Sequence, residues 1–149
     1  MAEPRTDCSR YPSHPAQVRN ARHHVERVLH LWGVDSALTE NAVLIASELV
    51  SNAVRHAEAP QAREFGMTLR LLQSIIRIEV RDADEQRPVV SSPRGDQEAV
   101  CGRGLQIVEH LASNWGTATE VLGKTVWAEI PLWLGNCPER TALYAADTS

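Results

Sequence analysis

Residues 42–57 read AVLIASELVSNAVRHA, and this stretch decides how the chain is interpreted. Glu48, Asn52 and His56 recur every four residues in an apolar run, and residues four apart share one face of an α-helix. A helix made mostly of Ala, Val, Leu and Ile is expected to be buried on most sides. Burying a carboxylate, an amide and an imidazole in register is unfavourable unless they meet partners or a ligand. The pattern therefore predicts a charged, hydrogen-bonding ligand over this stripe.

Composition limits the classes of protein to consider. The chain has 149 residues, 43% hydrophobic and 23% charged, which suits one globular domain. A net charge of −4, from 15 basic and 19 acidic residues, argues against direct nucleic-acid binding. Cys8, Cys101 and Cys137 are too widely spaced for a metal-ligand pattern and are expected to be reduced thiols. No apolar run reaches the length of a membrane span and no apolar signal core is present, so a cytoplasmic location is expected.

Hydrophobic periodicity and turn residues predict the elements. We expect an irregular N-terminal tail over residues 1–15, one domain over 16–134 and a C-terminal tail over 135–149. Gly33 is expected to end the first helix, and Thr39 to cap the second. The predicted elements are helices at 16–32, 39–57 and 105–114, strands at 65–72, 74–82, 115–122 and 124–132, and a long loop at 83–103. Hairpin connections then predict an α/β (α+β) two-layer sandwich, in which helices cover one face of a mixed, largely antiparallel sheet.

The polar stripe suggests phosphate chemistry. Glu48 can act as a general base, and the Asn52 amide oxygen is a suitable Mg²⁺ ligand beside phosphate oxygens. Arg55 and His56 add donors at the end of the helix, where phosphates can lie. The alternative is a solvated polar face with a capping histidine.

Three further segments carry groups suited to a nucleotide. Asp82 ends a strand, where a carboxylate can accept a hydrogen bond from an exocyclic amine such as that of adenine; Asp84 follows, and a turn-forming role is the alternative for these aspartates. Thr125, in the GKTVWAE hairpin at 123–129, can line a pocket or simply occupy a strand. The mouth of the third helix offers backbone N–H groups to an anion, although it fails as a Rossmann fingerprint. That mouth comprises Gly102, Arg103, Gly104 and Leu105.

Taken together, the order and spacing of these segments resemble a known family. ELVSNAVRHA (48–57) resembles the N box, VRDAD (80–84) the first glycine box and GRGLQIVEHLA (102–112) the second glycine box of the Bergerat-fold (GHKL) ATPases. The chain is most similar to the anti-sigma-factor serine/threonine kinases and to single-domain ATP-binding regulators of actinomycetes. The resemblance covers residues 16–133 and implies the histidine-kinase-like ATPase fold, with ATP and Mg²⁺ as cofactors.

The resemblance also implies roles for individual residues. Glu48 matches the general base and Asn52 the Mg²⁺ position, while Asp82 matches the aspartate that binds adenine. The remaining matched positions are expected near the nucleotide: His56, Gly102, Arg103, Gly104, Leu105 and Thr125. Asp84 departs from the family's D-x-G pattern, in which glycine lets the backbone pass close to the nucleotide. An aspartate there can narrow the pocket or repel phosphates, which leaves the affinity for ATP open.

By this resemblance the expected function is that of an ATP-dependent serine/threonine kinase and anti-sigma factor. Its partners would be a sigma factor and a small antagonist protein, which it phosphorylates in a partner-switching pathway; a homodimer is possible, and no membrane partner is expected. The alternative is an ATP-binding interaction module with little or no kinase activity. A histidine autokinase is disfavoured, because no phosphoacceptor helical hairpin is expected before the domain.

Overall fold

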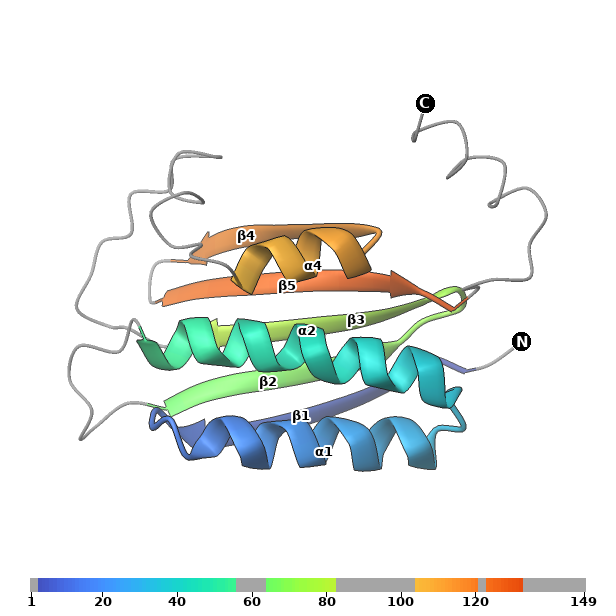
Figure 1. The fold of residues 1–149 in the computed structure, drawn as a ribbon, viewed down its shortest axis with the longest axis horizontal. Helices are drawn as coiled ribbons and strands as arrows, with labels where there is room; N and C mark the ends of the chain where they lie inside the picture. Colours follow the sequence, from blue (N-terminus) through green and yellow to red (C-terminus); the bar gives the residue numbers. More distant parts are fainter. Residues whose placement is uncertain (1–2, 56–63, 83–103, 121–122, 133–149) are drawn as a thin grey trace.

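The fold is a two-layer sandwich in which helices cover one face of an antiparallel sheet (Figure 1). This computed structural model describes residues 3–55, 64–82, 104–120 and 123–132. The elements are β1 (Arg5–Pro12), α1 (Gln17–Leu31), α2 (Ser36–Arg55), β2 (Glu64–Leu71), β3 (Ile75–Asp82), α4 (Gly104–Leu111), β4 (Asn114–Glu120) and β5 (Gly123–Pro131). No helix in these ranges is long and apolar enough to cross a membrane.

The sheet has the strand order β1-β2-β3-β5-β4. All four pairings among these described strands are antiparallel, so the sheet is more regular than the mixed one expected. The hairpins β2–β3 and β4–β5 account for two of the pairings. α4 precedes β4 in the chain, and β5, which follows β4, pairs antiparallel with β3. The predicted two-layer architecture, with its helices on one face, is confirmed.

Strand β1 corrects the prediction of an irregular tail over residues 1–15. It pairs with β2 along its whole length, from Arg5 opposite Leu71 to Pro12 opposite Glu64. Its partly buried side chains include Asp7, whose Oδ2 lies 2.6 Å from His24 Nε2 on α1, and Tyr11, which stacks on the Phe65 ring at 5.2 Å. Because this edge strand meets the helix layer mainly through polar groups, its sequence lacks the apolar alternation that marks the other strands.

The end of α1 and the start of α2 are each fixed by one residue. Gly33 has φ +75°, and its N–H donates to the carbonyl of His30 while the next residue donates to Leu29, which confirms the predicted helix stop. The predicted cap at Thr39 is wrong, since α2 begins at Ser36. Asp35 caps it: Oδ1 accepts from Ala37 N–H at 2.9 Å, and the Asp35 carbonyl accepts the first helical bond, from Thr39.

The core lies between the helices and one face of the sheet. Ile76, Ile78 and Val80 of β3 share the buried face, as their alternation predicts. α2 contributes most to the helix side, because its Ala, Ile, Leu and Val residues meet β3 and β5 beneath it as well as α1 and α4 beside it. The buried apolar positions of α2 are Leu38, Ala42, Ile45, Ala46, Leu49, Val50 and Ala53.

The other face of the sheet carries a network of ion pairs. Arg77 Nε donates to Glu79 at 2.7 Å and Nη1 to Glu129 at 3.0 Å, and the guanidinium lies 4.2 Å from the centre of the Trp127 ring. Burial lowers the pKa of Arg77, but the hydrogen bonds and charges of the two glutamates outweigh it, so the pKa is raised overall. The network pairs Arg77 with both Glu79 and Glu129 on this face.

Candidate functional site

Helix α2 places two of the predicted site residues in register. Glu48 is half-buried and Asn52, four residues later, is only 5% exposed. The Asn52 Nδ2 atom is buried and has no hydrogen-bond partner within the described part of the chain. An amide buried without a partner costs roughly 1–3 kcal/mol, so its position near the end of a well-packed helix suggests a ligand. The buried amide nitrogen argues against the alternative of a solvated polar face, on which water would satisfy it.

Strand β3 brings Asp82 to the same end of the domain. Asp82 is the last residue of β3 and lies opposite Phe65 in β2 and Lys124 in β5. Figure 1 shows that β3 and α2 both finish at the left-hand end of the view, where β5 begins. One carboxylate oxygen of Asp82, Oδ1, is buried.

The register does not bring Thr125 together with Asp82. Thr125 pairs with Arg81, and successive side chains of a strand point to opposite faces of the sheet. Trp127, two residues later, packs against Arg77 on the face away from the helices, so Thr125 belongs to that face. Lys124 is the β5 residue that shares the helix-covered face with Asp82. Lys124 was not predicted as a site residue, although it lies two alternate positions before the buried Ala128 and therefore on the same face of β5.

Helix α4 adds its N-terminus to this end. It begins at Gly104, the residue predicted at its mouth, and packs against α2 and β4. It ends at Leu111, before the predicted end at residue 114, because β4 begins at Asn114. Aligned peptide dipoles place partial positive charge at this N-terminus, which favours an anion such as phosphate. The other predicted positions, His56, Asp84, Gly102 and Arg103, lie outside the described residues, and the structure places the backbone of Leu105 in α4.

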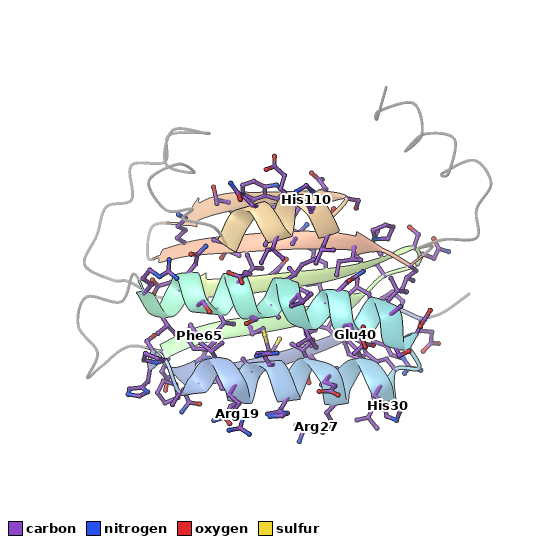
Figure 2. The ribbon with its side chains drawn as sticks, in the orientation of Figure 1. Arg19, Arg27, His30, Glu40, Phe65 and His110 are labelled. Atoms are coloured by element: carbon purple, nitrogen blue, oxygen red, sulfur yellow. The ribbon has the colours of Figure 1, made fainter. Side chains whose placement is uncertain are left out.

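A groove of about 920 Å³ lies elsewhere on the molecule, between α1 and the first half of α2. It is lined by Arg27 and His30 of α1 and Glu40 of α2, among others. Figure 2 shows these three residues toward the right, far along the helices from Phe65, which lies opposite Asp82 in the register. The groove is therefore separate from the end that holds Asn52 and Asp82.

Comparison with known proteins identifies the family. The profile of the histidine kinase-like ATPase domain matches residues 11–130, which is most of the chain. The chain belongs to this family. The match begins at Tyr11, near the end of β1, and ends in β5, so it spans both leading helices, strands β2 to β4 and every described candidate residue. No curated protein matches the chain significantly.

Two solved structures show how widely this fold is shared. The SiaB–SiaC complex from Pseudomonas aeruginosa matches with a TM-score of 0.63 and 11% identity, over 83% of this chain and 88% of the other. The RsbU and RsbW domains of Rv1364c from Mycobacterium tuberculosis match with a TM-score of 0.57 and 19% identity. That match covers 83% of this chain but 32% of the larger one. At these identities the two structures support the fold of the family alone.

Proposed function

We propose that this protein is an ATP-dependent serine/threonine protein kinase that acts as an anti-sigma factor and phosphorylates a small antagonist protein. The observation that carries the proposal is the buried amide nitrogen of Asn52, which has no partner among the described residues. Asn52 lies one helical turn after Glu48 and at the same end of the domain as Asp82. Membership of an ATPase family supports ATP as the phosphate donor.

The residues fit a magnesium nucleotide. Mg²⁺ in such sites is held by one or two protein oxygens together with phosphate oxygens and water, and the amide oxygen of Asn52 would be such a protein ligand. The orphaned Nδ2 of the same amide is a donor, which suits a phosphate oxygen beside the metal. Asp82 accepts from the adenine amine, and the N-terminus of α4 faces the phosphates. When bound, the metal would neutralise negative charge on the transferred phosphate. His56, Gly102, Arg103 and Leu105 are proposed to complete the nucleotide site, as the resemblance implies.

Glu48 is the proposed general base for phosphoryl transfer. The antagonist's serine oxygen forms a bond to the γ-phosphorus, the bond from that phosphorus to the bridging oxygen of ADP breaks, and the serine proton passes to the Glu48 carboxylate. The antagonist becomes a phosphoserine protein and ADP leaves. A cytoplasmic location and regulation of a sigma factor complete the proposal. One similar structure is itself a two-protein complex, SiaB with SiaC, which is a precedent for a protein partner on this fold.

The test is transfer of radiolabelled phosphate from ATP to a candidate antagonist encoded beside this protein. Glu48→Gln keeps the shape of the side chain but removes the base, so transfer should fall at least about 100-fold. Glu40→Gln, an exposed change on the same helix, is the matched control and should transfer at the wild-type rate. Equal rates for wild type and Glu48→Gln would remove Glu48 from the reaction. Tight ATP binding with no transfer to any antagonist would favour the alternative, an ATP-binding interaction module.

A further inference from the structure

The register between β3 and β5 brings one basic residue to the proposed base-binding aspartate. Asp82 and Lys124 are direct partners, in the last position of β3 and the second of β5. Two residues further into the sheet, Val80 is buried and its partner Val126 packs against the core. Because alternate residues of a strand point to the same face, Asp82 and Lys124 also face the helices. Directly opposed residues of an antiparallel pair have Cβ atoms about 4.5–5.5 Å apart. The two side chains therefore leave the sheet together, on the helix-covered face.

Lys124 is also distinctive in the chain as a whole. It is the only lysine among the 15 basic residues; the other 14 are arginines. Its side chain is half-buried, and within the described structure it makes no ion pair within 4 Å of a carboxylate. The arginines of β3 and β2 on the opposite face, Arg77 and Arg70, by contrast both lie near Glu79. Ion pairing within the described sheet therefore does not explain why a lysine occupies position 124.

The two groups are complementary to one edge of adenine. An ionised carboxylate only accepts hydrogen bonds and an ammonium group only donates them. Adenine presents a donor, the exocyclic N6 amine, directly beside an acceptor, the ring nitrogen N1. We propose that Lys124 is a second adenine-binding residue, whose ammonium donates to N1 while Asp82 accepts from the N6 amine. This inference rests on the proposed function, because it requires ATP at this end of the domain.

The same pair would discriminate against guanine. In the same orientation guanine presents the O6 acceptor to the Asp82 carboxylate and the N1–H donor to the Lys124 ammonium. Both contacts are then unfavourable in a partly desolvated site, because one places an acceptor against an acceptor and the other a donor against a donor. Lys124 is accordingly a specificity-determining residue for the base and takes no part in phosphoryl transfer.

The experiment compares binding of ATP and 1-deaza-ATP, in which N1 is replaced by C–H and the N6 amine is kept. Wild-type protein should bind 1-deaza-ATP about tenfold or more weakly, because the analogue leaves the ammonium without its acceptor. Lys124→Met keeps the length of the side chain and removes the donor, so it should bind the two nucleotides equally. Lys124→Arg should restore part of the discrimination. Arg70→Met removes one positive charge on the opposite face and should retain the wild-type ratio.

A second measurement uses the wild-type protein alone. Because Lys124 is the only lysine, amine-reactive acylation can be followed at this side chain by mass spectrometry, and saturating ATP should slow it at least about tenfold while GTP leaves it unchanged. If ATP binds and the ratio for 1-deaza-ATP is the same in wild type and Lys124→Met, the inference is overturned while the proposed function stands. If ATP does not bind wild-type protein, the proposed function fails first. Protection by GTP equal to that by ATP would overturn the role in base specificity.

Discussion

At the scale of single residues, Asn52 shows a conflict between stability and function. Its amide nitrogen is buried in an apolar helix and has no partner in the part of the chain that the structure describes, which is unfavourable in the absence of ligand. Asn52→Leu replaces this amide with an apolar group of similar size. We expect it to raise the free energy of unfolding of the ligand-free protein by roughly 1–2 kcal/mol and to remove the Mg²⁺-dependent part of ATP binding. Urea unfolding and calorimetric titration with and without Mg²⁺ measure the two effects.

Thr39 provides the matched control on the same helix. Its Oγ1 is also buried without a partner in the described structure, but it lies in the first half of α2, beside the groove. Thr39→Val should leave the free energy of unfolding unchanged or raise it, and should not alter ATP binding. Loss of stability in Asn52→Leu together with unchanged Mg²⁺ dependence would contradict the role given to Asn52.

At the scale of elements, the start of α2 depends on Asp35. The Asp35 carboxylate accepts from the Ala37 N–H, a backbone group that the helix itself leaves without a partner. Asp35→Ala should lower the free energy of unfolding by about 1 kcal/mol, measured by urea unfolding. Thr39→Val, at the position predicted as the cap from sequence, should show no such loss. The reverse order of the two effects would refute the observed helix boundary.

The accuracy of sequence-based prediction differs between elements for physical reasons. α2, β2 and β3 were predicted within a few residues, because each buries an apolar face and its periodicity is visible in the sequence. β1 was missed, because an edge strand that meets α1 through Asp7 and Tyr11, both against His24, has no apolar repeat. The Asp35 cap was missed because Thr39 also precedes a long apolar run and suits the same role.

At the scale of the whole molecule, the candidate site is assembled from distant segments. Asn52, Asp82, Gly104 and Lys124 come from four different elements that meet at one end of the sandwich. Motif spacing predicted the first three, but the partner of Asp82 follows from the pairing of β3 with β5 across more than forty residues. That register is a property of the folded sheet, whereas the family resemblance implied Thr125 near the adenine.

The central claim, that Mg-ATP binds at this end of the domain, is tested most directly by thermal unfolding. At a concentration about 100 times its dissociation constant, a ligand stabilises by about 2.7 kcal/mol, which is roughly 5–10 °C in Tm for a domain of this size. The wild-type protein should show this rise, and Asp82→Ala should lose most of it. Gly116→Ala is the control, because its new Cβ would lie 2.9 Å from the Trp127 ring on the opposite face, lowering Tm without changing the rise. No rise for the wild type in saturating Mg-ATP, or an equal rise in Asp82→Ala, would contradict the account.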